Sequence, residues 1–246
     1  MTIVKRNRLD KLLVEMGHVE SRQRAQAMIM AGKVLVNNMP VDKPGVQVAS
    51  NAEIIVKEPE FSYVSRGALK LAEAVEKLDL SLTDLECLDV GASTGGFTDF
   101  MLQNGARKVY AVDVGYGQLA WKLRQDQRVV VLERTNIRHM EKESIEGPVD
   151  LVVIDTSFIS LKIVVPSVLK FMKEDAMILA LIKPQFEVGK GKVGKGGVVR
   201  DPLLHKEVIE ELTAFFTGLG LTPERVIPSP ITGPKGNREF IIALKK

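Results

Sequence analysis

Four ionisable residues of this chain have side chains that could together move a proton, although they lie far apart in the sequence. Three of them adjoin predicted strands and the fourth lies on the helix before the first strand: Asp155, Lys183, Glu239 and Lys70. Strand ends line one crevice in a doubly wound α/β sheet, so we expect these two amines and two carboxylates to converge there. Beside a cofactor loop, such a cluster predicts proton removal from a hydroxyl group. Considered singly, each residue could instead be a solvated or paired charge.

A glycine-rich segment, LDVGASTGGFTDFM at 88–101, has the pattern of a strand, a tight turn and a helix. Glycines in the turn let backbone N–H groups approach a ligand closely. The spacing is D-x-G-x-x-x-G-G, and the G-x-G-x-x-G fingerprint of dinucleotide sites is absent. S-adenosylmethionine has no phosphate and therefore tolerates a looser loop than a pyrophosphate does. The pattern favours an S-adenosylmethionine site over an NAD or FAD site or an empty structural turn.

Acidic and polar residues near this segment complete the predicted cofactor site. Asp89 could offset the positive charge of S-adenosylmethionine, and Asp113, 22 residues after Gly91, could accept both ribose hydroxyls. Asn136 follows the third predicted strand and could contact the adenine. The predicted cofactor-binding residues are Asp89, Gly91, Ser93, Gly95, Gly96, Phe97, Asp113 and Asn136.

The elements that would position these residues alternate between helical and strand patterns from Ser65 onward. We expect helices at 68–78, 97–103, 118–125, 162–172 and 203–219, and strands at 85–90, 108–112, 129–132, 149–154, 177–182, 223–227 and 240–244. Such alternation predicts a mostly parallel sheet covered on both faces. The last two strands are joined by the short, turn-rich 228–238, so the final strand should run antiparallel. The predicted fold is α/β, a seven-stranded Rossmann-like sheet with the last strand inserted antiparallel, as in S-adenosylmethionine-dependent methyltransferases.

The first 58 residues have the composition of a separate, basic module. They hold nine Lys/Arg and six Asp/Glu, whereas the remaining 188 residues hold 25 of each, so the net charge of +3 lies in this segment. Two helices are predicted, the second capped by Ser21 and followed by Gly32, and short strands follow at 34–36 and 54–56. This small α+β module could contact an RNA backbone, or its charges could simply be solvated. The predicted RNA-binding residues, including three on the larger module, are Arg6, Arg8, Lys11, Arg22, Arg24, Lys33, Arg66, Lys190 and Lys192.

The composition predicts a soluble, cytoplasmic protein. A 246-residue chain that is 45% hydrophobic has ample material for a buried core. Its single cysteine, Cys87, fits a reducing compartment and excludes a disulfide framework. The N-terminus lacks a secretory signal, and no apolar run approaches the roughly 20 residues of a membrane span. The three histidines lack metal-ligand spacing, so we expect no metal site, and a monomer is favoured.

Two parts of the sequence resemble known families. The run Arg8–Gly45 resembles the small RNA-binding domain first described in the fourth protein of the small ribosomal subunit. The segments SRGALKL (65–71), DVGASTGGF, Asp155, Lys183-Pro184 and NREF resemble the FtsJ-like ribose 2′-O-methyltransferases. The whole chain is similar to the TlyA family of bacterial rRNA 2′-O-methyltransferases, once called haemolysins. The corresponding domains are 1–58 for RNA binding, 59–64 as a linker and 65–246 for methyl transfer.

The resemblance has specific implications for the reaction. Lys70, Asp155, Lys183 and Glu239 match the family's Lys-Asp-Lys-Glu catalytic tetrad. Lys183 would contact the ribose hydroxyl and either accept its proton or stabilise the emerging oxyanion. The implied cofactor is S-adenosylmethionine, and the implied substrate is a cytidine ribose in ribosomal RNA, naked or within a ribosomal subunit. The 23S rRNA is implied for all members, with 16S rRNA added in members with longer termini.

Three other functions remain to be weighed against this one. The old family name implies a membrane-active haemolysin, although no long apolar segment supports it. A non-catalytic RNA-binding ribosome factor would keep the basic module without needing the four charged residues. A nicotinamide oxidoreductase would share the sheet but should bind NADH.

Overall fold

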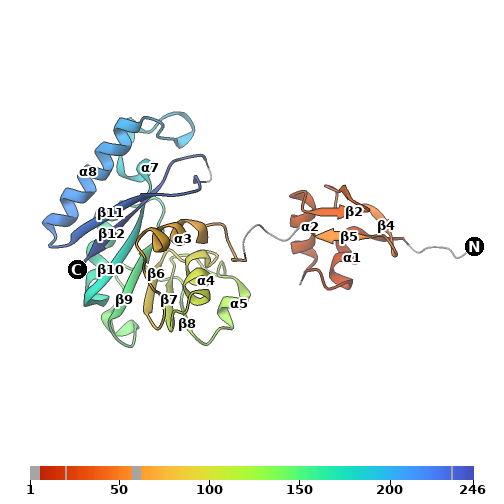
Figure 1. Cartoon of the computed structure of the whole chain (residues 1–246), viewed down its shortest axis with the longest axis horizontal. Coiled ribbons are helices and arrows are strands. Elements are labelled where there is room, and N and C mark those ends of the chain that lie inside the picture. The colour runs from red at the N-terminus through yellow and green to blue at the C-terminus, as the bar shows by residue number, and fades with distance from the viewer. Residues whose placement is uncertain (1–5, 20, 57–61, 234) are drawn as a thin grey trace, which may run out of the picture. The chain divides into compact units, whose positions relative to one another are not determined.

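The computed structural model describes residues 6–19, 21–56, 62–233 and 235–246. The chain divides into two compact units, Met1–Ser62 and Tyr63–Lys246 (Figure 1). Half of the predicted linker, residues 59–61 of 59–64, falls outside the described residues. Its end packs on the second unit, where the Tyr63 ring meets Phe100 edge-on with centroids 5.5 Å apart. This ring contact anchors the first residue of the second unit to α4.

Two helices form the core of the first unit, as the sequence predicts. They are α1 (Leu9–Glu15) and α2 (Arg22–Met30). Ser21 caps α2, because its Oγ accepts a hydrogen bond from the N–H of Arg24 at 3.2 Å. Gly32 follows the helix in the left-handed region, at φ +67°. The buried apolar side chains of this unit are Leu9, Leu12, Leu13, Ala25, Ile29, Val34 and Val48.

Short strands complete the first unit. The predicted β2 (Val34–Val36) and β5 (Ile54–Val56) pair antiparallel, and β3 (Met39–Pro40) adds to the other edge of β2. A second pair joins β1 (Arg6–Arg8) to β4 (Gln47–Ala49). These last two strands and β3 were not predicted, because their residues (RNR, QVA and MP) lack the continuous β-branched and apolar character of β2 (VLV) and β5 (IIV).

The second unit contains a seven-stranded sheet in the order β11-β12-β10-β9-β6-β7-β8. All neighbouring pairs from β10 to β8 are parallel, while β12 pairs antiparallel with both β10 and β11. The prediction of a last strand inserted antiparallel is therefore confirmed. The strands are β6 (Glu86–Val90), β7 (Lys108–Val112), β8 (Val129–Leu132), β9 (Val149–Ile154), β10 (Met172–Ile182), β11 (Thr222–Pro228) and β12 (Phe240–Lys245).

Helices cover this sheet on both faces (Figure 1). The α-helices are α3 (Ala68–Lys77), α4 (Gly96–Gln103), α5 (Trp121–Arg124), α6 (Leu161–Val168), α7 (Pro184–Glu187) and α8 (Pro202–Gly218). Short 3₁₀ turns lie at η1 (Lys142–Ser144), η2 (Leu169–Phe171), η3 (Lys190–Lys192) and η4 (Lys195–Gly197). Across the described ranges, none of the helices has the length and apolar character needed to span a bilayer.

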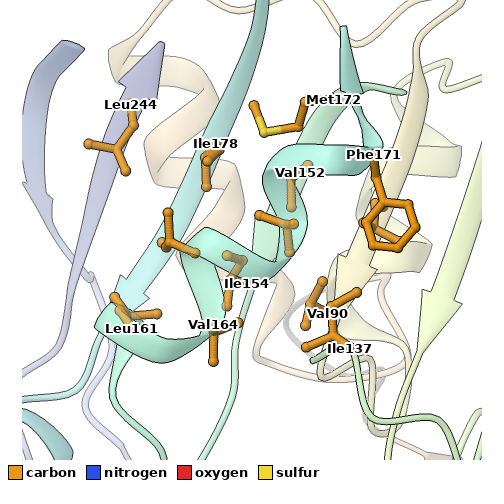
Figure 2. Close-up of a cluster of buried hydrophobic side chains, with 14 of the residues drawn as sticks. Val90, Ile137, Val152, Ile154, Leu161, Val164, Phe171, Met172, Ile178 and Leu244 are labelled. Carbon is orange, nitrogen blue, oxygen red and sulfur yellow. The ribbon is translucent and has the colours of Figure 1, made fainter. Parts of the chain in front are cut away.

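Alternate residues of each strand face two separate apolar layers, as the period of a strand requires. Helices α3, α4 and α5 pack against residues such as Cys87 and Val109. Helices α6 and α8 pack on the opposite face, against residues such as Leu88 and Val152. Figure 2 shows this second layer, with side chains of α6 gathered beside those of β6, β9 and β10. The two layers fix the strand ends from which the charged residues project.

Two predicted helices are longer in the sequence pattern than in the structure. The expected helix 162–172 ends at Val168, and Met172 already belongs to β10, which has a register shift before Met177. The apolar spacing at the end of this segment fits a helix or a strand, so periodicity could not place the boundary. The expected helix 118–125 is reduced to α5, because the backbone of Ala120 is still extended.

Candidate active site

The four predicted charged residues meet at one edge of the sheet. Asp155 directly follows β9, and Lys183 directly follows β10. Glu239 directly precedes β12. Because β12 runs antiparallel to β10, its first residue lies opposite the last residue of β10, at the same edge of the sheet. Lys70 comes from α3, which packs near β12. The topology therefore brings together residues separated by up to 169 positions along the chain.

These side chains form a continuous line of ion pairs. The Nζ atom of Lys70 lies 2.6 Å from Oε2 of Glu239 and 3.7 Å from Oδ2 of Asp155. The Nζ atom of Lys183 lies 2.5 Å from Oδ1 of Asp155. Lys70, Lys183 and Glu239 are buried, and Asp155 is the most open of the four. Buried charges are costly unless paired, and here each amine lies against a carboxylate.

Ser157 is a further member of this cluster that no motif in the sequence singles out. Two serines lie shortly before or at the start of α6, and both are residues that commonly cap helices. Ser160 does cap α6, accepting a hydrogen bond from the N–H of Lys162. The hydroxyl of Ser157 instead accepts a hydrogen bond from Nζ of Lys183 at 3.0 Å. Its position two residues after Asp155, still at the strand end, is the signal that could have indicated this contact.

A hollow of about 300 Å³, here the first hollow, opens beside the charged cluster. It is lined by all four charged residues and by much of the predicted cofactor loop. The residues of that loop in its wall are Asp89, Gly91, Ala92, Ser93, Thr94, Gly96 and Phe97. Arg66, predicted to contact RNA, also lines it and is exposed. The reacting groups and the glycine-rich loop thus share one space.

A second hollow, of about 500 Å³, adjoins the first and shares Gly91, Ser93, Asp155 and Ser157 with it. Asp113 and Asn136, the predicted ribose and adenine contacts, both line this second hollow, as do apolar side chains including Val112 and Ile137. The combination of an apolar wall with a few polar groups suits a nucleoside.

Asp113 is held in place by the backbone around it. Its Oδ2 accepts the N–H of Ser93 at 2.7 Å, and its Oδ1 accepts the N–H of Gly115 at 2.7 Å. Each carboxylate oxygen has a second acceptor position, so both oxygens can still accept hydroxyl donors from a ligand.

Asp89 is completely buried at the wall of the first hollow. Its Oδ2 accepts a hydrogen bond from the hydroxyl of Thr98 at 2.6 Å, while its Oδ1 has no partner among the described residues. Burial, with smaller contributions from the charges of Asp155 and Asp113, raises the pKa of Asp89 to about 7, against the opposing effect of the Thr98 hydrogen bond. A buried carboxylate oxygen without a partner is a ready acceptor for a cationic ligand group.

Two glycines of the loop serve close packing. Gly91 has φ +87°, and a Cβ atom there would lie 2.5 Å from the carbonyl oxygen of Asp155. Gly95 has φ +94°, and a Cβ atom there would lie 2.2 Å from a methyl group of Leu123. Gly95 lines neither hollow, and its N–H is bonded to the carbonyl of Ala92. Gly95 therefore allows the loop to pack closely against α5, and its contact with a ligand stays a prediction.

The predicted RNA-binding residues of the first unit fall into two groups. Arg8 and Arg22 both bind the carboxylate of the fully buried Asp10, at 3.0 Å and 2.9 Å. These contacts hold the pKa of Asp10 well below its usual range, and the hydrogen bond from Arg8 has the largest effect. The two arginines therefore also neutralise a buried carboxylate, a structural role that the sequence pattern did not indicate. The remaining predicted residues of this unit are exposed or half-buried on its surface, namely Arg6, Lys11, Arg24 and Lys33.

The two predicted RNA-binding lysines in the basic loop of the second unit are Lys190 and Lys192, and their role in binding RNA stays a prediction. Nζ of Lys192 lies 2.6 Å from a carboxylate oxygen of Glu207, so its charge is partly neutralised. The side chain of Lys190 lies outside the described part of the chain. Within that described part, no group of three or more potential metal ligands gathers.

The fold and the site together define a class of protein. A seven-stranded sheet with an inserted antiparallel strand, a glycine-rich loop after β6 and a charged cluster at the adjoining strand ends is the arrangement of an α/β methyltransferase. Residues 63–246 match the FtsJ-like methyltransferase family, and residues 7–54 match the S4 domain. The chain belongs to the FtsJ-like methyltransferase family and carries an S4 domain at its N-terminal side.

Relatives match along nearly the whole chain. One is the 16S/23S rRNA (cytidine-2'-O)-methyltransferase TlyA of Mycobacterium tuberculosis, 48% identical over 244 residues that cover 99% of this chain and 91% of the relative. Another is YqxC of Bacillus subtilis, named as a suspected rRNA methyltransferase, with 47% identity over 98% of this chain and 86% of the relative. A solved structure of a suspected hemolysin from Streptococcus thermophilus has 43% identity and a TM-score of 0.77, covering 99% of this chain and 89% of that one.

Proposed function

We propose that this protein transfers a methyl group from S-adenosylmethionine to the 2′-hydroxyl of a cytidine ribose in 23S rRNA, with 16S rRNA as a second candidate substrate. The observation that carries the proposal is the convergence of Lys70, Asp155, Lys183 and Glu239 at the wall of the first hollow. Membership of the FtsJ-like family and the name of the 48% identical relative support the reaction class and the cytidine.

The two adjoining hollows fit the cofactor. S-adenosylmethionine, when bound, supplies a methyl group already activated by its sulfonium. The unpartnered Oδ1 of Asp89 would accept a hydrogen bond from its amino group, and Asp113 would accept the two ribose hydroxyls. The hydroxyl of Thr156 is buried in the wall of the second hollow, has no partner among the residues that the structure describes, and offers a further contact. Asn136 lines the same hollow and would contact the adenine.

The charged cluster would prepare the attacking hydroxyl. An ammonium group has three N–H donors, and Lys183 uses one on Asp155 and one on Ser157. The third would donate to the ribose oxygen, which would orient its lone pair and stabilise the negative charge left on that oxygen as its proton departs. Asp155, bonded directly to this amine, would accept the departing proton, and the O–C bond would replace the methyl–sulfur bond that breaks. Lys70, bridging Glu239 and Asp155, would keep that carboxylate oriented.

The S4 domain would supply RNA affinity. Within the proposed domain division of 1–58, 59–64 and 65–246, its exposed basic residues would contact phosphates, and Arg66 would do so at the mouth of the first hollow. This proposed substrate implies a cytoplasmic protein that acts on rRNA or ribosomal subunits. Phosphate contacts of this kind should make RNA binding weaken steeply with added salt.

Transfer of a labelled methyl group tests the proposal. Purified protein would be incubated with labelled S-adenosylmethionine and, separately, with large and small subunits that lack the modification. Digestion of the rRNA and mass analysis of its nucleosides should yield 2′-O-methylcytidine. RNA binding without label transfer would instead support the non-catalytic ribosome factor, and leakage of dye from liposomes would support a membrane-active protein.

A further inference from the structure

Three buried polar side-chain atoms lack hydrogen-bond partners among the residues that the structure describes. They are Oδ1 of Asp89, Oγ1 of Thr156 and Oε1 of Gln185. Buried polar groups are almost always bonded to protein, to ordered water or to a ligand, so each of these three atoms can accept a donor from a bound ligand. The first two lie in the first and second hollows, where the proposed cofactor accounts for them. The cofactor hollows do not include Gln185, and its acceptor needs another explanation.

Gln185 lines a third hollow, of about 470 Å³, which also borders the charged cluster. Lys183 and Glu239 line this hollow as well as the first one, and Ser157 lines all three. A ribose with its hydroxyl at Lys183 therefore has the third hollow immediately beside it. The substrate part attached to that ribose is a base, so this hollow is placed to receive the target nucleobase.

The walls of the third hollow suit a flat, polar-edged ring. Phe158 is 90% exposed, and its ring lies 5.0 Å from that of Phe186, with both rings lining the space. Phe158 also has φ +65°, a strained conformation for an aromatic residue and one that is often kept for function. Exposed aromatic faces of this kind stack on unpaired bases.

Two side-chain amides line the hollow, and one of them is already occupied. Oδ1 of Asn237 accepts the N–H of Val199 at 2.9 Å, and its Nδ2 donates to the carbonyl of Gly197 at 2.9 Å. Asn237 thus holds the loop that forms part of the wall. Gln185 is the amide that remains for a ligand, and its buried atom without a partner is a hydrogen-bond acceptor.

We propose that Gln185 is a specificity-determining residue whose Oε1 accepts a hydrogen bond from the exocyclic amino group of the target cytosine. This inference rests on the proposed ribose methylation and adds the means by which the base is chosen. Cytosine presents an N4 amino donor at that position, whereas uracil presents a carbonyl acceptor. In the orientation that the structure gives the amide, Oε1 would face O4 of uracil, and two acceptors cannot bond, so uridine would have to turn the amide or leave both oxygens unpaired.

The test compares Gln185→Met, Gln185→Glu and the control Gln127→Met, a glutamine that is exposed and outside the three hollows. The substrates are ribosomal subunits that carry either C or U at the methylated position, once that position has been mapped with the wild-type enzyme. Initial rates of methyl transfer would be measured on both, and affinity for S-adenosylhomocysteine would be measured by calorimetry.

Gln185→Met, which keeps side-chain length but loses the acceptor, should lower kcat/KM for the C substrate by roughly 10- to 100-fold and bring the C-to-U ratio close to one. Affinity for S-adenosylhomocysteine should change less than about twofold, as it should in the Gln127→Met control. Gln185→Glu keeps an acceptor and should retain preference for C, which preserves the test if the methionine variant folds poorly.

An unchanged C-to-U ratio in Gln185→Met, or a glutamate variant that loses its preference for C, would overturn the assignment of Gln185. These results would leave the proposed function intact, because the wild-type enzyme would still methylate cytidine. Failure of the wild-type enzyme to methylate either subunit would reject the proposed function itself, and the two failures are therefore distinguishable.

Discussion

Cofactor affinity should depend on pH through Asp89, the buried carboxylate at the wall of the first hollow. Burial raises the pKa of this group to about 7 in the ligand-free protein. The amino group of the cofactor is cationic and would bind the ionised carboxylate. Protonation of Asp89 must therefore be reversed before binding, and affinity should fall as the pH decreases through about 7.

The size of this effect follows from the fraction of Asp89 that is ionised. With a pKa of about 7, that fraction is about 0.9 at pH 8 and about 0.1 at pH 6. The dissociation constant of S-adenosylhomocysteine should therefore rise about tenfold between pH 8 and pH 6, and about tenfold more for each further unit of acidification, until other groups protonate.

Calorimetric titration with S-adenosylhomocysteine across this range would measure the dependence. Asp89→Asn should weaken binding at pH 8 by roughly 10- to 100-fold, because the charge-assisted hydrogen bond is lost, and should flatten the pH profile. Asp175→Asn, a change at an exposed carboxylate on β10, should leave both affinity and profile unchanged. A wild-type affinity that stays constant from pH 8 to pH 6 would refute the reasoning.

The same raised pKa has an opposite consequence for the ligand-free protein. A carboxyl group whose pKa is higher in the folded state destabilises the fold progressively as the pH rises from about 4 to about 7. The cost at pH 8 is on the order of 4 kcal/mol for a shift of this size. Asp89→Asn should therefore raise the Tm of the ligand-free protein at pH 8, although it lowers the affinity for the cofactor. Scanning calorimetry with and without S-adenosylhomocysteine would separate the two effects.

Three further changes test other parts of the site and of the S4 domain. Asp10→Asn removes a buried partner of two arginines and should destabilise the S4 domain by about 3 kcal/mol at neutral pH, seen as faster amide exchange in α1 and α2 of the full chain. Because the pKa of Asp10 is lowered by folding, this difference should vanish as the pH falls below about 4 and through the folded value. Gly91→Ala would force the loop away from Asp155 and should abolish transfer and lower the Tm, whereas an unchanged rate would show that the close approach is dispensable. Ser157→Ala should lower kcat about tenfold without changing cofactor affinity, and an equal loss in both would indicate a structural role.

The fold was largely predictable because its signals are periodic. Apolar runs ending at Asp155 and Lys183, and the short connection before Glu239, were sufficient to predict a parallel sheet with a reversed last strand. Boundaries were harder to place where one pattern fits two elements. The segment around Met172 is an example, since its apolar spacing suited the end of a helix as well as the start of β10.

Parts of the site that depend on three-dimensional packing could not be predicted. Gln185 has no neighbour in the sequence that indicates an unpartnered acceptor, because only folding decides which amide finds a hydrogen bond. The ion pairs of Asp10 were also not predictable, because its burial and its contacts with Arg8 and Arg22 arise from the packing of α1 on α2. The close packing of Gly95 against Leu123 was also not predictable, because the sequence of the loop does not show which side chain will lie beside each glycine.

The central claim is that Lys183 acts on the ribose hydroxyl and does not hold the cofactor. The most direct measurement is single-turnover methyl transfer by Lys183→Ala, together with its affinity for S-adenosylhomocysteine. Lys206→Ala, at an exposed position of α8, is the matched control. We expect transfer by Lys183→Ala to fall about 1,000-fold or more, with cofactor affinity within about threefold of the wild type. Transfer at the wild-type rate, or loss of cofactor binding in proportion to loss of transfer, would contradict the account.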